Sequence, residues 1–175
     1  MPAKTPGGKM IIGPQQLNHL VQFHGLVSPY AGEVKLDSID LSLGTIWKHS
    51  GGASLISKQH RHTGAKKELM HSEGIWTLEP NTFYLAKTIE SVNLPPYMAA
   101  ICLNTSTPFR SGVLVTAGYV DPGYYGEIHF GFTTPGPGQT EIAYGFPMVQ
   151  LVFFTAEPTV YKGVYNGGKT EPVGK

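Results

Sequence analysis

Short apolar stretches separated by glycine and proline are the feature that most constrains the fold of this chain. The 22 Gly and 14 Pro residues are spread over 175 positions without an internal repeat, so they divide the apolar sequence into short pieces. This punctuation is typical of many short strands joined by turns, and no regular alternation of strands with long helices is present. The sequence therefore predicts an all-β fold, either a sandwich, a barrel or a jelly roll.

Strands are predicted wherever apolar residues alternate or cluster between turn residues. The predicted strand segments are 10–12, 39–43 (ended by Gly44), 76–88 (two strands around the Glu79-Pro80-Asn81 turn), 99–103, 113–120, 127–133 and 148–155. The best helix candidate is residues 15–23, because Pro14 suits a first helical turn and Gly25 suits a helix end.

The length fits one domain, which we place at residues 10–160. Residues 1–9 are expected to form a flexible extension, and residues 161–175 a separate C-terminal tail. Residues 49–74 are polar and contain no convincing strand, so they are expected to form an exposed loop or a long hairpin within the domain.

Composition excludes several classes of protein. The formal net charge is +1, from 13 basic and 12 acidic residues, which gives no electrostatic footprint for nucleic acid or a membrane surface. The single cysteine, Cys102, excludes an internal disulfide and is expected to be a small buried residue. The N-terminus lacks the apolar region of a secretory signal, and no apolar run reaches membrane-spanning length, so a soluble cytoplasmic protein is expected.

The densest group of candidate functional residues lies between positions 104 and 131. The hydroxyls of Thr105, Ser106 and Thr107 precede Arg110, and hydroxyls with a guanidinium are suited to phosphate oxygens. The same residues could instead close a turn and form an ion pair. Asp121 follows the extended segment 113–120 in a Pro-Gly turn, where a carboxylate can activate water or cap the turn.

A second group of polar residues comprises His60, Arg61, His62 and His71. His-x-His spacing places two imidazoles on one side of a strand, which can favour a metal ion. No carboxylate or cysteine nearby completes a ligand set, so a solvated loop is the preferred interpretation.

Several ordered blocks resemble the dCTP deaminase/dUTPase superfamily. They are LDSIDLSLG (36–44), LEPNTFYLAKTIESVNLP (78–95), TSTPFRSG (105–112), VTAGYVDPGYYGEI (115–128), GFPMVQLVFF (145–154) and YKGVYNGG (161–168). The resemblance implies a distorted β jelly roll or β-barrel of the dUTPase-like type with a short N-terminal helix. It also implies a homotrimer with sites between subunits, a pyrimidine deoxynucleoside triphosphate as ligand, Mg²⁺, and a tail that covers the nucleotide.

The resemblance also distinguishes between the two activities of this superfamily. Members that deaminate dCTP carry a general-base Glu five residues after the Gly that corresponds to Gly126, and Gly131 stands at that position here. In contrast, the dUTPase pattern of an Asp, a Tyr and Gly-Glu is matched by Asp121, Tyr124, Gly126 and Glu127. The implied reaction is hydrolysis of dUTP to dUMP and pyrophosphate.

By the same resemblance, Asp121 would activate the water that attacks the α-phosphorus, and Tyr124 would lie beneath the deoxyribose and exclude a ribose. The remaining implied roles are base recognition by Val115, Thr116, Ala117 and Gly118, triphosphate binding by Ser106, Thr107, Arg110 and Gln150, and further substrate contacts from Glu127, Tyr161, Lys162 and Tyr165. Mg²⁺ would be held mainly by the triphosphate and water, without dedicated protein ligands.

Three positions depart from the family pattern. Thr105 stands where the phosphate loop usually has Arg, while Val164 and Gly168 stand where relatives often have Lys and Gln. The alternatives are therefore a dCTP deaminase or bifunctional enzyme with another base, a pyrophosphatase for a modified pyrimidine triphosphate, and a catalytically silent trimer that binds nucleotide or a protein partner.

Overall fold

The computed structural model describes residues 10–31, 33–34, 36–57 and 61–168. The predicted extension at residues 1–9, His60, and the end of the predicted tail at residues 169–175 lie outside this part of the chain. Fifteen elements follow one another in the described residues, two helices and thirteen strands, so the predicted all-β fold with a short N-terminal helix is confirmed.

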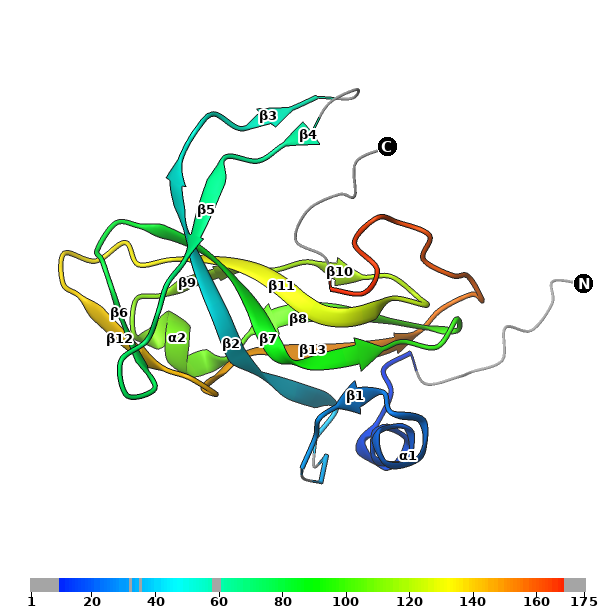
Figure 1. Ribbon diagram of the computed structural model, residues 1–175. Helices are drawn as coiled ribbons and strands as arrows, with labels where there is room; N and C mark the ends of the chain where they lie inside the picture. Colours follow the sequence, from blue (N-terminus) through cyan, green and yellow to red (C-terminus); the bar gives the residue numbers. More distant parts are fainter. Residues whose placement is uncertain (1–9, 32, 35, 58–60, 169–175) are drawn as a thin grey trace, which may run out of the picture.

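One curled antiparallel sheet forms the body of the protein (Figure 1). Its strand order is β10 (Tyr119–Val120), β8 (Met98–Asn104), β13 (Pro147–Thr155), β2 (Ser38–Gly51), β7 (Phe83–Asn93), β11 (Tyr125–Thr133) and β9 (Leu114–Thr116). Two short strands lie beside this path, β1 (Val27–Ser28) against β7 and β5 (Ala65–Glu68) against β2. Two small separate ladders pair β12 (Thr140–Ala143) with β6 (Ile75–Leu78) and β3 (Leu55–Ile56) with β4 (Arg61–His62).

The chain connectivity requires this sheet to curl. Strands β9 and β10 lie at opposite ends of the strand order, yet only Ala117 and Gly118 separate them in the chain. Two residues can bridge only a few ångströms, so the two ends of the sheet must approach each other. The result is a half-barrel, and the predicted segment 113–120 is therefore two strands in different parts of the sheet rather than one continuous arm.

Alternating burial along the long strands builds the core. In β7 every second residue is buried, and the Tyr84 ring stacks on Phe132 of β11 with 5.3 Å between the ring centroids. Helix α1 (Pro14–His24) buries Leu17 and Leu20. It ends at Gly25 with φ of 60°, as the sequence predicts for residues 15–23.

Gly44 does not end a strand, contrary to the prediction. Strand β2 continues through it to Gly51, with an irregular register against β7 between Leu43 and Thr45. A Cβ atom at Gly44 would lie 3.0 Å from backbone atoms of Thr88 and Ile89. Glycine is therefore needed because two backbones approach closely inside the sheet.

The described residues 49–57 and 61–74 form strands of a long hairpin, one of the two predicted alternatives, although the prediction that this region contains no convincing strand is wrong. The end of β2, β5 and the β3–β4 ladder project from the body of the sheet in Figure 1. Two smaller corrections concern the predicted strand 10–12, which is an isolated bridge between Ile11 and Phe154, and residues 106–110, which form the short helix α2 (Ser106–Arg110).

Candidate functional site

A cavity of about 310 Å³ lies between the two curled parts of the sheet and the C-terminal segment. It is lined by Leu85, Cys102, Gly118, Tyr119, Val120, Asp121, Tyr124, Ile128, His129, Tyr161 and Tyr165. Five predicted site residues come together here: Gly118, Asp121, Tyr124, Tyr161 and Tyr165. Most of the lining is apolar or aromatic, so the cavity can enclose a flat ring and offers few polar groups to orient it.

The Asp121 carboxylate is placed at the cavity by a tight turn. The backbone N–H of Tyr124 donates to the carbonyl of Asp121 at 3.1 Å, and Gly123 has φ of 74°. A type II turn requires a positive φ at its third position and favours proline at its second, and Gly123 and Pro122 meet both conditions. The local sequence therefore places Asp121 and Tyr124 on either side of one turn.

Tyr124 is held rigidly against the cavity wall. Its hydroxyl donates to the backbone carbonyl of Glu127 at 2.8 Å, and its ring meets that of Tyr161 at 5.8 Å in an edge-on arrangement. Burial, with smaller contributions from Glu127 and Tyr161, raises the pKa of Tyr124 to about 12. The side chain is therefore a neutral, fixed platform near pH 7.

The C-terminal segment crosses the turn of its own chain (Figure 1). The backbone N–H of Tyr161 donates to Pro122 at 2.7 Å, and the Asn166 side chain accepts from the backbone N–H of Tyr125 at 2.8 Å. These bonds bring Tyr161 and Tyr165 to the cavity. Gly168 packs so closely on Glu127 that a side chain at position 168 would overlap the carboxylate.

His129 lines the same cavity, and sequence reasoning did not identify it. The register between β11 and β7 shifts between Glu127 and His129, and Trp47 of β2 stacks on the imidazole with 6.2 Å between centroids. Burial and the nearby Lys87 lower the pKa of His129, and among the described residues its Nε2 is a buried polar atom without a hydrogen-bond partner.

Gly131 lies two residues further along β11, beneath an aromatic ring of β7. A Cβ atom at position 131 would lie 2.6 Å from Cζ and 2.8 Å from Cε2 of Phe83. Real Cβ atoms do not approach so closely, so the Phe83 ring occupies the space into which a side chain at position 131 would extend.

Comparison with known proteins places the chain in a family. A family model described as dCTP deaminase-like matches residues 11–156. The chain belongs to this dCTP deaminase-like family. It is 30% identical over 166 residues to a dUMP-forming dCTP deaminase of Aquifex aeolicus, covering 91% of each chain. It is also 32% identical over 163 residues to a probable deoxyuridine 5′-triphosphate nucleotidohydrolase of Methanothermobacter thermautotrophicus, covering 93% of this chain and all of that one.

A solved structure shares the fold of this dCTP deaminase-like protein. The 2′-deoxycytidine 5′-triphosphate deaminase from Agrobacterium tumefaciens superposes with a TM-score of 0.65 at 18% identity, over 84% of this chain and 48% of that one. The relatives are enzymes that carry both activity names, so similarity alone leaves deaminase and hydrolase open for this family member.

The predicted phosphate-binding residues of this dCTP deaminase-like chain lie away from the cavity. Helix α2, which carries Ser106, Thr107 and Arg110, lies near β12, on the other side of the molecule from the C-terminal segment (Figure 1). Thr107 lines a separate cavity of about 120 Å³. The Thr105 hydroxyl donates to the carbonyl of Pro147 at 2.8 Å, so it serves the local backbone.

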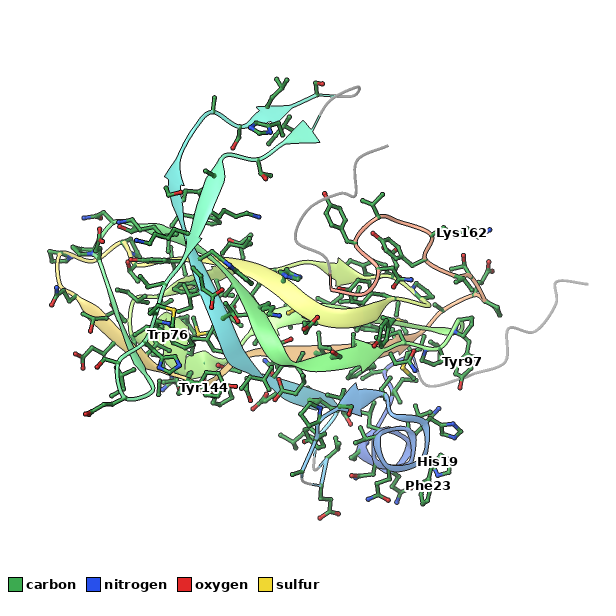
Figure 2. The ribbon with its side chains drawn as sticks, viewed as in Figure 1. His19, Phe23, Trp76, Tyr97, Tyr144 and Lys162 are labelled. Atoms are coloured by element: carbon green, nitrogen blue, oxygen red, sulfur yellow. The ribbon has the colours of Figure 1, made fainter. Side chains whose placement is uncertain are left out.

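Other predicted contacts also lie outside the cavity lining. Gln150 of β13 accepts from the Ser38 hydroxyl and donates to the carbonyl of Asn104, both at 3.4 Å. The Glu127 carboxylate forms an ion pair with Lys87 at 3.1 Å. Burial alone would raise the pKa of Glu127, but hydrogen bonds and the charge of Lys87 lower it overall. Lys162 is exposed and points outward from the C-terminal segment in Figure 2.

Three of the four residues predicted to read the base are not among the described residues that line the cavity. Val115 and Thr116 belong to β9 and pair with Phe132 and Gly131, while Ala117 packs against the core. Of these backbone positions, Gly118 alone is among the described cavity residues.

The described histidines outside the cavity do not assemble a metal site. The His71 ring contacts Trp76 and Tyr144, whose positions Figure 2 marks, and its Nδ1 accepts from the backbone N–H of Gly74 at 3.2 Å. The described residues contain no group of three or more His, Cys, Asp or Glu side chains that could hold a metal ion. Within the described part of the chain, no helix is long and apolar enough to cross a membrane.

Proposed function

We propose that this protein hydrolyses dUTP to dUMP and pyrophosphate. The observation that carries the proposal is the distribution of carboxylates at the cavity. Asp121 is the one carboxylate among the described lining residues, and the Phe83 ring covers Gly131, where deaminating relatives are expected to carry their general-base Glu. The cavity thus has a carboxylate that can accept a proton, Asp121, in the 121–124 turn, whereas position 131 has no side chain that could do so.

In the proposed reaction, Asp121 accepts a proton from the water that attacks the α-phosphorus. The water oxygen forms a bond to that phosphorus while the bond to the bridging oxygen of the β-phosphate breaks. Pyrophosphate leaves, and the proton remains on Asp121 until solvent removes it. The type II turn supports this role because its local geometry holds the carboxylate at the cavity rim.

Tyr124 would provide the selection for deoxyribose. Its hydroxyl is bound to Glu127 and its ring contacts Tyr161, so the ring cannot move aside for a larger sugar. A rigid aromatic surface under the sugar leaves no room for a 2′-hydroxyl and supplies no partner for one. The expected discrimination is therefore steric and independent of charge.

The triphosphate would require groups from outside this cavity. No Lys or Arg is present among the described cavity residues, whereas Arg110, Ser106 and Thr107 lie together on α2. In a homotrimer with sites between subunits, α2 and Gln150 of a neighbouring protomer would bind the phosphates, and the exposed Lys162 would add a charge from the tail. We propose this assembly as part of the function.

Mg²⁺ fits the site only when it is bound together with the substrate. Because the described residues form no cluster of metal ligands, phosphate oxygens and water would supply most of its coordination, and Asp121, the one carboxylate among the described lining residues, could contribute a ligand. When bound, the ion would neutralise charge on the phosphates.

A product assay tests the proposal. Purified protein with Mg²⁺ is incubated separately with dUTP and dCTP, nucleotides are resolved by chromatography, and pyrophosphate and ammonia are measured. We expect dUMP and pyrophosphate from dUTP, with turnover at least about 10²-fold lower in Asp121→Asn and unchanged binding. Asp37→Asn is the matched control, because Asp37 is an exposed carboxylate outside the cavity.

Deamination of dCTP is the second candidate function, favoured by the similarity to the dUMP-forming deaminase of Aquifex aeolicus. Ammonia released from dCTP would establish it and would contradict the assignment of Gly131 as a lost deaminase position. Binding of either nucleotide without any product would contradict both enzymatic functions and favour a silent binding protein.

A further inference from the structure

The long hairpin carries a positive charge that the proposed hydrolysis does not use. Residues 48–67 contain five of the 13 basic residues and none of the 12 acidic residues. The rest of the chain is therefore net acidic, so the formal net charge of +1 conceals a separation of charge. We call the described part of this segment, residues 48–57 and 61–67, the basic arm.

The pairing of β2 with β5 places basic side chains opposite each other at the base of the basic arm. Lys48 lies opposite Lys67 on one face of the ladder, and His49 lies opposite Lys66 on the other. Like charges directly across a ladder lower its stability. Glu79 offsets one of them through an ion pair with Lys48 at 2.6 Å, whereas Lys67 is exposed. The ladder therefore leaves positive charge that an anionic partner would offset.

The outer end of the basic arm also exposes apolar side chains. In the β3–β4 ladder, Leu55 is 53% exposed and Ile56 is 89% exposed. Because the hairpin projects from the body of the sheet in Figure 1, the body of the same chain does not cover these residues. A partner that fits the basic arm thus offers both negative charge and an apolar contact.

A surface with those two properties lies at the opposite end of β2. Residues 33–40, which lead into this strand, contain the exposed residues Glu33, Asp37 and Asp40 against one basic residue. Leu36, between the carboxylates, is 72% exposed. We call the described residues of this stretch, 33–34 and 36–40, the acidic end. It matches the basic arm, because each surface has exposed apolar side chains beside charges of opposite sign.

The basic arm cannot reach the acidic end of its own chain. Strand β2 has 14 residues, so it spans about 45 Å at about 3.3 Å per residue. It begins near β1, and the hairpin continues outward from its other end (Figure 1). A contact between the two surfaces must therefore join two copies of the chain, head to tail. When repeated, such a contact either closes into a ring or extends as an open chain.

We propose that the basic arm is a docking element that binds the acidic end of a second copy of this chain. The lysines of β5 then face the carboxylates of the acidic end, and the apolar residues of β3 cover Leu36. The inference adds a contact to the proposed assembly of protomers and does not depend on the reaction at the cavity. Asp37→Asn, the control in the product assay, leaves two of the three carboxylates in place, and one exposed ion pair contributes little.

Exchange of the charges tests this contact by sedimentation velocity over a range of protein concentrations at low salt. The arm variant is Lys66→Glu/Lys67→Glu, whose new carboxylates face the basic side chains of β2 across the ladder and therefore do not oppose folding. The acidic-end variant is Glu33→Lys/Asp37→Lys. We expect each variant to raise the dissociation constant of self-association about tenfold or more. A variant with all four changes should return it to within about threefold of the wild-type value.

Two controls separate docking from a general effect of charge. Glu73→Lys/Glu157→Lys changes the net charge as much as the acidic-end variant does, at exposed residues outside both surfaces, so it should leave self-association unchanged. A mixture of the arm variant with the acidic-end variant should form mixed complexes, because each altered surface then meets opposite charge on the other variant. Circular dichroism checks that every variant is folded.

Equal self-association of the arm variant and the wild-type protein would overturn the inference, even where dUTP is hydrolysed. A monomeric wild-type protein would overturn it too, as would a variant with all four changes that does not regain association. Binding of a DNA duplex that the arm variant loses, with self-association unchanged, would assign the basic arm to nucleic acid instead. Failure of the proposed function is seen separately, as absence of pyrophosphate from dUTP in the wild-type protein.

Discussion

Replacing Gly131 with Ala should lower the free energy of unfolding when the Phe83 ring is present and raise it when the ring is removed. With Phe83 in place, the new Cβ would lie 2.6 Å from the ring, and overpacking of this kind costs about 1–3 kcal/mol. Gly131 has no positive φ, so Ala fits the backbone and gains about 0.5–1 kcal/mol by restricting the unfolded chain. The expected net loss of unfolding free energy is about 0–2.5 kcal/mol.

In the Phe83→Ala variant the ring is absent, so adding Gly131→Ala should raise the free energy of unfolding by about 0.5–1 kcal/mol. The coupling energy between the two positions should therefore be about 1–3 kcal/mol. Urea unfolding of the four proteins, followed by tryptophan fluorescence at one fixed protein concentration, measures it. Gly136→Ala is the control, because nothing lies within 4 Å of a Cβ at that position.

Additive effects, with a coupling below about 0.5 kcal/mol, would refute the reasoning about this contact. They would mean that Phe83 moves away at no cost, so that position 131 has room for a side chain. The structural part of the case against the deaminase position would then be lost.

Three further predictions follow from buried or crowded groups. Burial raises the pKa of Cys102 to about 12, so a thiol-reactive dye at pH 8 should label this residue only after denaturation. Gly126 has φ of 134° and would overlap Gly168 if it carried a side chain. Gly126→Ala should therefore release the C-terminal segment and speed its proteolysis, and the strained φ should also lower the free energy of unfolding by about 1–3 kcal/mol. Folding lowers the pKa of His129 from its ordinary value of 6.5, so the unfolded chain binds a proton at a higher pH than the folded chain does. The free energy of unfolding should therefore fall as the pH drops below 6.5. His129→Phe should remove the part of this fall that His129 causes.

The strand content follows from local sequence, whereas the curl of the sheet does not. Glycine and proline mark where strands end, and alternation in segments such as 83–93 identifies which side faces the core. Gly44 shows the limit of that approach, since it looks like a strand end but lies inside β2 against the backbone of Thr88. Only the pairing partner, more than forty residues away, distinguishes the two cases.

The site was predictable where its geometry is local. Asp121, Pro122, Gly123 and Tyr124 form one turn, so the sequence specifies their relative placement directly. His129 carries no such local signal, because its position at the cavity depends on a register shift and on Trp47 from a distant strand. The one available hint in the sequence was that His129 lies two residues before Gly131 and therefore on the same face of the strand.

The proposed function and the charges at the cavity together imply that two protomers bind different parts of one substrate molecule. The Asp121 carboxylate lines a cavity without a Lys or Arg among its described residues. A triphosphate bound beside it alone would bring like charges together, which a nearby cation must offset. The cavity of one protomer therefore suits the nucleoside half of dUTP, and Arg110 on α2, remote from the cavity of its own chain, is suited to the phosphates of a neighbour's substrate. On this reasoning a monomer would retain a nucleoside pocket but lose turnover.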